Sequence, residues 1–388
     1  MKTKFRYQGS YLSYVILFFF FYVCMGVFTS ILSVYLIGIG KSNTEMSFIM
    51  SGANLFGIVM IPAVGYTVDR VRKPKLIVSV LLAMMAAMSL IFAACRSTFV
   101  LYLLNGLIMG VINAVFPVTE RAAGSGRFRY GTIRIWGTIG YAASAQLSGV
   151  LLAHTEPTFI FMMFFTSAIL AIIGLAGTAA ISGKQESQSK TSMGRQFSFL
   201  RSPSFLLFVI ISFIFTGGST LMLSYGPVFL QKLGMSSDVV GTVLAVSTLI
   251  ELPIILFSNK FMDRFSGKIL LMVNFGIMFV QYLCYGVTYS AIAAVIVMLL
   301  LKATGSTLFM MIRLKIVKNL VGEEAISTAQ GVESAVSAVG AIILLNAGGL
   351  IAEMTDIHTL FFAFSGLMVF GFVLCIFLKI NNTKKVFS

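Results

Sequence analysis

Long apolar runs separated by short polar segments occupy almost the whole chain. Each run has about 20 residues or more, which is the length that a helix needs to cross roughly 30 Å of hydrocarbon. The pattern therefore predicts an all-α integral membrane protein. The twelve predicted transmembrane helices lie near residues 11–37, 44–66, 75–95, 98–120, 130–153, 157–181, 204–231, 238–261, 268–289, 291–316, 325–352 and 357–380.

One long polar stretch, residues 182–203, interrupts this series and separates six predicted helices from the other six. We therefore expect two halves, residues 1–181 and 204–388, joined by a cytoplasmic linker. Two related six-helix halves around a central cavity are typical of transporters that work by alternating access. The pattern thus predicts both the domain boundary and a class of function.

A short motif occurs once in each predicted half. The two Asp-Arg pairs are separated by 194 residues, which is half of the 388-residue chain. The aspartate carboxylate of each pair lies at a predicted helix end. It can contact a basic residue in one conformation and lose that contact in the other, which biases the equilibrium between the two conformations. We therefore predict a conformational latch; solvated loop charges are the alternative. The latch residues are Gly65, Asp69, Arg70, Lys73, Asp263 and Arg264.

Composition supports a membrane protein. Hydrophobic residues make up 58% of the chain and charged residues 11%, and the mean hydropathy is +0.97, whereas soluble domains carry roughly 25% charged residues. The net charge of +15 does not indicate nucleic-acid binding, because the basic residues lie in short loops and form no basic domain. Of the 28 lysines and arginines, Lys41, Arg96 and Lys232 are expected on one side and Lys302 within the membrane, which leaves 24 on the side of both termini. This asymmetry predicts a multi-pass protein of the cell membrane with cytoplasmic termini.

Two ionisable residues of the first half fall within predicted membrane helices. Glu120 ends the fourth and Arg134 lies one turn into the fifth, and because an isolated charge is costly in hydrocarbon, we expect them to pair. Tyr141 lies two turns after Arg134 and Asn113 two turns before Glu120, so each shares its neighbour's face. Together these groups favour a polyhydroxylated ligand; the alternative is an ion pair that only joins two helices. Tyr22, in the aromatic run of the first helix, is expected to face lipid.

The predicted helices of the second half contain Glu251, Lys302 and Glu333. Lys302 can neutralise one of the two acids, and the other can then bind a proton near neutral pH, because burial disfavours the charged form. We expect Glu251 to titrate, because Pro253 weakens the local helix ladder and opens room for water. Glu333 is also consistent with an interfacial charge, and all three with a structural trio.

The Gly65-x-x-x-Asp69-Arg70 loop, followed by basic residues, resembles the signature of the major facilitator superfamily. The segments FFFFYVCMG (18–26), KSNTE (41–45) and YGTIRIWGTIGYA (130–142) are similar to the lactose permease branch of oligosaccharide:proton symporters, and phenylpropionate and nucleoside permease-like groups look similar at this level. The resemblance implies the major facilitator fold. It also implies that Glu120, three residues after Pro117, binds a sugar together with Arg134 and the aromatic Tyr141.

The resemblance is weaker in the second half. Glu251 matches a family glutamate on the eighth helix, but the family's arginine on the ninth falls on Gln281, and its His-x-x-Glu on the tenth falls near Gly305 and Leu308. In the lactose permease those positions govern proton coupling. Galactoside specificity and the proton route of that branch are therefore not implied for this chain.

These patterns favour a proton-coupled importer of a sugar or another small hydroxylated solute. The alternatives are a proton-coupled exporter of drugs or metabolites, an importer of an aromatic acid or nucleoside, and a receptor or scaffold without transport. Against export, the fifth helix lacks the Gly-Pro motif common in exporters. The sequence carries no enzyme signature, and we expect no cofactor or metal. The expected partners are the solute, protons and the lipid bilayer, and we expect the chain to function as a monomer.

Overall fold

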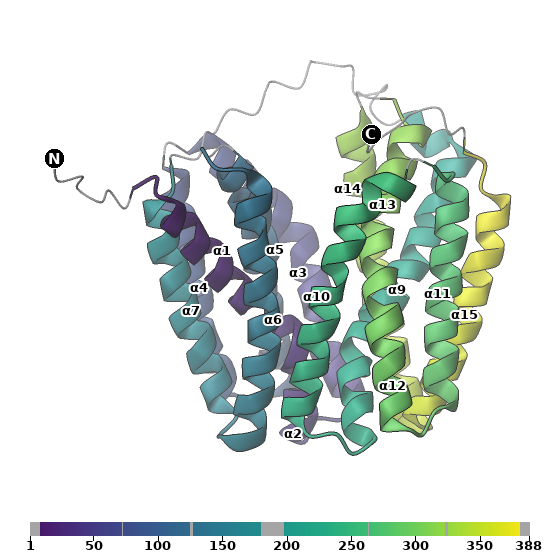
Figure 1. Cartoon of the computed structure of the whole chain (residues 1–388), viewed down its shortest axis with the longest axis horizontal. Helices are drawn as coiled ribbons and strands as arrows, with labels where there is room; N and C mark the ends of the chain where they lie inside the picture. Colours follow the sequence, from purple (N-terminus) through teal and green to yellow (C-terminus); the bar gives the residue numbers. More distant parts are fainter. Residues whose placement is uncertain are drawn as a thin grey trace. The chain divides into compact units, whose positions relative to one another are not determined.

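The computed structural model describes residues 8–71, 73–124, 127–179, 198–262, 264–322 and 325–380. Its regular elements in these ranges are all helices, and no β-strand occurs in them (Figure 1). The predicted all-α fold class is therefore confirmed. The helices of the first part of the chain are α1 (Tyr11–Gly26), η1 (Val27–Ile31), α2 (Leu32–Gly38), α3 (Asn43–Arg70), α4 (Pro74–Ala94), α5 (Thr98–Gly124), α6 (Tyr130–His154) and α7 (Thr158–Gly177).

The second part of the chain repeats this all-helical organisation. Its elements are η2 (Ser198–Arg201), α9 (Pro203–Lys232), α10 (Ser237–Phe261), α11 (Gly267–Val287), α12 (Ala291–Val297), η3 (Met298–Lys302), α13 (Ala303–Leu320), α14 (Ile326–Met354) and α15 (Ile357–Phe377). Within it, α9 packs against α14 and α11 packs against α15. In the first part, α1 packs against both α6 and α7.

The chain forms two compact units. Unit 1 comprises Met1–Lys41, Phe48–Glu186 and Ser236–Ala245, and unit 2 comprises Ser42–Ser47, Ser187–Met235 and Val246–Ser388. The start of α3, up to Ser47, thus belongs to unit 2, whereas the rest of α3 belongs to unit 1. The start of α10, up to Ala245, belongs to unit 1, whereas the rest of α10 belongs to unit 2. The boundaries expected from the sequence, at residues 181 and 204, stay a prediction, and most of the linker lies outside the described residues.

In the described part of the chain, nine helices are long and apolar enough to cross a membrane. The predicted spans 130–153, 238–261 and 291–316 coincide with α6, α10 and the α12–η3–α13 segment, which are not among those nine. These are the three predicted spans that carry Arg134, Glu251 and Lys302. The count of twelve spans therefore stays a prediction, while the membrane-spanning architecture is shown.

Small residues allow the helices of unit 1 to pack closely. A Cβ atom on Gly140 of α6 would lie 2.2 Å from the carbonyl oxygen of Phe19 in α1, and one on Gly174 of α7 would lie 2.4 Å from the amide nitrogen of Leu17. Both distances are far below van der Waals contact. The backbone of α1 therefore touches α6 and α7 directly, as is common where helices associate within lipid.

Two π-helical turns interrupt the described helices, and the sequence pattern did not predict them. Val27–Ile31 lies between α1 and α2, and Met298–Lys302 lies between α12 and α13. A π turn accommodates an extra residue and is frequent at functional sites.

Candidate functional site

Glu120 lies in the last turns of α5 and is the centre of a polar cluster in unit 1. Its Oε1 atom accepts a hydrogen bond of 2.9 Å from the Tyr22 hydroxyl and lies 3.5 Å from Nε of Arg134. Its Oε2 atom accepts a hydrogen bond from the Tyr130 hydroxyl. The structure thus pairs Glu120 with Arg134, as expected from the cost of isolated charges. We call Tyr22, Glu120, Tyr130 and Arg134 the Glu120 cluster.

Tyr22 is a member of this cluster that sequence reasoning placed wrongly. Its side chain is only 3% exposed, so the expectation that it faces lipid is wrong. The Arg134 guanidinium lies over the Tyr22 ring, 4.6 Å from its centroid, which is a cation–π contact. Gly137 makes room for the ring, because a Cβ atom there would lie 2.8 Å from Tyr22 Cδ2. The small residues of α6 could have indicated that an aromatic ring packs on that helix.

The cluster is partly open. The side chain of Glu120 is 19% exposed and that of Arg134 is 34% exposed. A carboxylate and a guanidinium form the strongest hydrogen bonds to neutral partners, and two phenol groups beside them can both donate and accept. The arrangement is therefore suited chemically to a neutral solute with several hydroxyl groups and an apolar face.

The other two predicted binding residues make different contacts. The Tyr141 hydroxyl lies 2.8 Å from Oγ1 of Thr29, which belongs to η1. Asn113 is half-buried on α5 beside α3, since a Cβ atom on Gly57 would lie 3.8 Å from Asn113 Nδ2. The role of Asn113, Tyr141 and the Glu120 cluster in binding a solute stays a prediction.

Glu333 lies inside unit 2 and is fully buried. Its Oε2 atom is 3.4 Å from Nη1 of Arg313 on α13, and its Oε1 atom accepts a hydrogen bond of 3.1 Å from the Ser337 hydroxyl. Glu333 is therefore a buried, paired charge, and its role in proton coupling stays a prediction. Glu251 is half-buried in α10, and the side chain of Lys302 lies outside the described residues.

Sequence reasoning missed Arg313 as the partner of Glu333. Arg313 lies three residues before the end of the predicted span 291–316, among the basic residues of the segment MIRLKIVK, and so was grouped with the loop charges. A fully buried carboxylate requires a partner, because an unpaired buried charge is strongly destabilising. Had Glu333 been taken as buried, this requirement would have indicated that a basic residue such as Arg313 lies beside it.

The first Asp-Arg motif is held by an ion pair within unit 1. Oδ1 of Asp69 lies 2.7 Å from Nη1 of Arg121 on α5. The Arg70 guanidinium lies over the Tyr66 ring, 4.1 Å from its centroid. Lys73 is exposed just before α4, and a Cβ atom on Gly65 would meet nothing within 4 Å.

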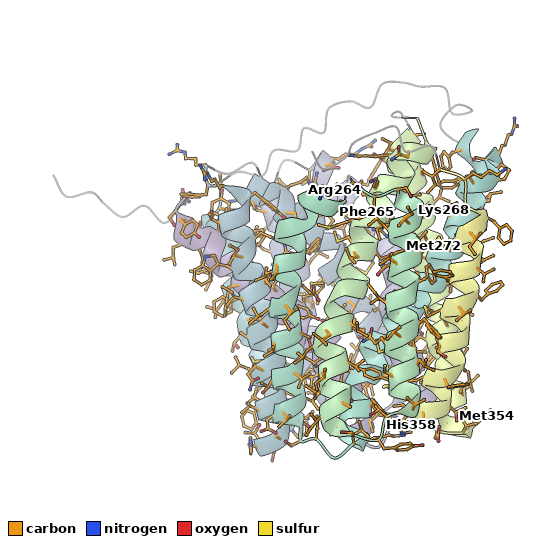
Figure 2. The ribbon with its side chains drawn as sticks, turned by 45° about the vertical axis from the view of Figure 1, so that its right-hand side comes forward. Arg264, Phe265, Lys268, Met272, Met354 and His358 are labelled. Atoms are coloured by element: carbon orange, nitrogen blue, oxygen red, sulfur yellow. The ribbon has the colours of Figure 1, made fainter. Side chains whose placement is uncertain are left out.

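The second motif has a related arrangement in unit 2. Asp263 lies outside the described residues, and Arg264 is exposed in the turn after α10, near Phe265 and Lys268 (Figure 2). The buried Lys315 holds this turn, because its Nζ atom donates to the carbonyl oxygens of Met262 and, at 2.8 Å, of Phe265. A basic side chain from another helix therefore contacts the last turn of α3 in unit 1 and the turn after α10 in unit 2.

The fold and these charged clusters define a helical membrane transporter. The chain belongs to the MFS_1 like family, whose family model matches residues 11–379. It is 22% identical over 350 residues to the uncharacterized transporter YwbF of Bacillus subtilis (strain 168), covering 89% of this chain and 87% of that one. It is 23% identical over 369 residues to the maltose permease of Geobacillus stearothermophilus, covering 93% and 92%.

A solved structure shares the fold. The crystal structure of the nucleoside transporter NupG aligns with a TM-score of 0.78 and 16% identity, covering 95% of this chain and 98% of that chain. The resemblance to the major facilitator superfamily is therefore confirmed. The relatives and this structural neighbour are transporters, so the chain is a transporter and not an enzyme.

Proposed function

We propose that this chain is a proton-coupled importer of a sugar or another small hydroxylated solute, working by alternating access as a monomer in the cell membrane. The observation that carries the proposal is the Glu120 cluster, which gathers a carboxylate, a guanidinium and two phenol groups in one partly exposed place. The relative described as a maltose permease supports a sugar as the solute. The excess of basic residues in the loops supports cytoplasmic termini.

In this proposal, solute hydroxyl groups exchange with hydrogen bonds that now lie within the Glu120 cluster. A solute hydroxyl can donate to Glu120 and accept from Arg134, while the ring of the half-buried Tyr141 offers an apolar face. The exchange is close to balanced in hydrogen bonds, so specificity comes from the positions of the donors and acceptors. Asn113 would contribute a further amide on α5.

Coupling is proposed to involve the carboxylates of the second half, Glu251 and Glu333, with Lys302. A proton on one of them favours loading from outside, and loss of the proton inside resets the carrier. The membrane potential supplies ~2.3 kcal/mol per charge for each 100 mV of potential, in addition to the pH gradient. The Asp69–Arg121 pair is proposed as a latch that forms in one conformation and opens in the other.

Counterflow in proteoliposomes tests the proposal. Proteoliposomes that contain the purified protein would be loaded with maltose, other sugars, nucleosides, aromatic acids or lipophilic cations, and exchange of each solute would be measured at two pH values. We expect exchange of a neutral sugar with pH-dependent kinetics, and we expect Glu120→Gln to lower it at unchanged protein amount. Outward movement of lipophilic cations, or exchange of aromatic acids alone, would contradict the proposed solute class.

A further inference from the structure

The π turn η1 places one side chain of the first span against a predicted binding residue. Oγ1 of Thr29 lies 2.9 Å from the Met25 carbonyl oxygen and 2.8 Å from the Tyr141 hydroxyl. A threonine hydroxyl has one proton, so it cannot donate to both oxygens at once. When the Met25 carbonyl accepts that proton, Tyr141 donates to Thr29, and the Tyr141 oxygen then presents its lone pairs to other donors.

The contact repeats, two turns further on, another contact that α1 makes with α6. Tyr22 contacts Arg134 at 4.6 Å, and Thr29 contacts Tyr141 at 2.8 Å. On both helices the second contact lies seven residues after the first, a rise of about 10 Å. These two contacts lie about two turns apart on the same helix pair, a spacing on the scale of a solute with two sugar rings.

Close packing fixes the backbone on both sides of this contact. A Cβ atom on Gly26, the residue before η1, would lie 1.8 Å from the Ser144 hydroxyl oxygen, and Ser144 donates to the Tyr141 carbonyl oxygen at 2.8 Å. The turn is therefore seated directly on the segment of α6 that carries Tyr141. π turns of this kind are concentrated at functional sites.

We propose that Thr29 is a positioning residue for solute binding. Its hydroxyl, set by the π turn Val27–Ile31, fixes the Tyr141 ring and orients the Tyr141 oxygen to accept a hydrogen bond from a solute hydroxyl. The proposal rests on the proposed function, because it assigns a role within the same site. It adds η1, which neither the sequence pattern nor the family resemblance had connected with binding.

A set of variants in the counterflow assay tests the proposal. Thr29→Val keeps the shape of the side chain and removes its hydroxyl, so we expect the KM to rise about fivefold, the effect of one hydrogen bond. Thr29→Ser restores the hydroxyl and should stay within about twofold of the original KM. In a Tyr141→Phe background, Thr29→Val should change the KM no further, because the partner hydroxyl is already gone.

Thr166→Val is the matched control. Thr166 is exposed on α7 and its hydroxyl lies 3.0 Å from the Met162 carbonyl oxygen, so the variant loses the same type of bond within a helix at a position outside the proposed site. Its KM should not change. The role of Thr29 is overturned if Thr29→Val also leaves the KM unchanged, or if its effect is equally large in the Tyr141→Phe background. Either result would leave the proposed transport function intact. If the unaltered chain exchanges no hydroxylated solute, the proposed function fails and this inference fails with it.

Discussion

At the scale of single residues, the structure stabilises charges in an apolar chain by surrounding them with specific donors. Glu120 accepts hydrogen bonds from two tyrosines and lies beside Arg134, which itself covers the Tyr22 ring. Glu333 has Arg313 and the Ser337 hydroxyl. Because Arg134 lies on α6 and Arg313 on α13, each ion pair joins two helices and so helps to fix how they pack.

Tyr22→Phe tests the contribution of one such donor. The variant keeps the ring under Arg134 and removes only the hydrogen bond to Glu120, so we expect a loss of about 1 kcal/mol in the free energy of unfolding. We also expect a higher KM for the transported solute. Thermal unfolding followed by the fluorescence of Trp136, the one tryptophan of the chain, measures the first effect. A variant as stable as the original would show that this bond contributes nothing to the fold.

At the scale of elements, α1 is the organising helix of unit 1. It packs against both α6 and α7, its aromatic side chains are largely buried, and glycines on the two neighbours allow direct contact of the backbones. The ends of other helices are held by side chains: Lys75 donates to the carbonyl oxygen of Thr178 after α7, and Lys268 donates to that of Ile376 near the end of α15. A basic group at a helix C-terminus is favourable because of the helix dipole.

Gly140→Ala should disrupt the contact between α6 and α1. The new Cβ atom would lie 2.2 Å from a backbone oxygen, which cannot rotate away, so the helices must separate. We expect a destabilisation of about 2 kcal/mol or more. Gly131→Ala on the same helix is the control, because a Cβ atom there meets nothing within 4 Å. Equal melting temperatures for the two variants would show that the close approach is not required.

Asp356 provides a pH-dependent helix cap outside the membrane-spanning segments. Its Oδ1 atom accepts a 2.6 Å hydrogen bond from the amide of Thr359, and this bond lowers the pKa of the Asp356 carboxyl below its ordinary value. A lowered pKa means that the stabilisation is present above the ordinary pKa of about 4 and is lost as the pH falls through the folded-state value. Asp356→Ala should therefore cost about 1 kcal/mol at neutral pH. The difference in melting temperature should narrow below about pH 4, and a constant difference would contradict the cap.

At the scale of the whole molecule, the two units repeat a set of contacts as well as a fold. Arg121 and Lys315 are 194 residues apart, the same separation as Asp69 and Asp263; Arg121 contacts the last turn of α3, and Lys315 contacts the turn after α10. Lys75 binds a carbonyl oxygen just after α7, and Lys268 binds one near the end of α15. The two units therefore share this way of fixing their helix ends.

Glu251→Gln and Glu333→Gln test coupling in the whole carrier. If a carboxylate takes up the transported proton, its amide variant should lose accumulation against a gradient and retain counterflow, because exchange needs no net proton movement. Uptake driven by an imposed pH gradient, compared with counterflow in the same vesicles, measures both. Glu156→Gln, an exposed residue of the loop before α7, is the control. Undiminished uphill uptake in either variant would remove that residue from the mechanism.

The sequence by itself determined the helical membrane class, the approximate helix positions, the repeat of the Asp-Arg motif and the pairing of Glu120 with Arg134. These properties follow from local hydropathy and from the cost of an isolated charge, which does not depend on the details of packing. Spacing within one helix was also sufficient to place Tyr141 two turns from Arg134.

Only the tertiary structure decided which side chains meet across helices. Tyr22 is buried and does not face lipid, Glu333 pairs with Arg313, and Thr29 reaches Tyr141 from a π turn. Every run of apolar residues in this chain is compatible with several buried faces, since lipid and protein interior are equally apolar. The face that is buried depends on contacts with helices distant in the sequence, and the apolar pattern of a single run does not specify them.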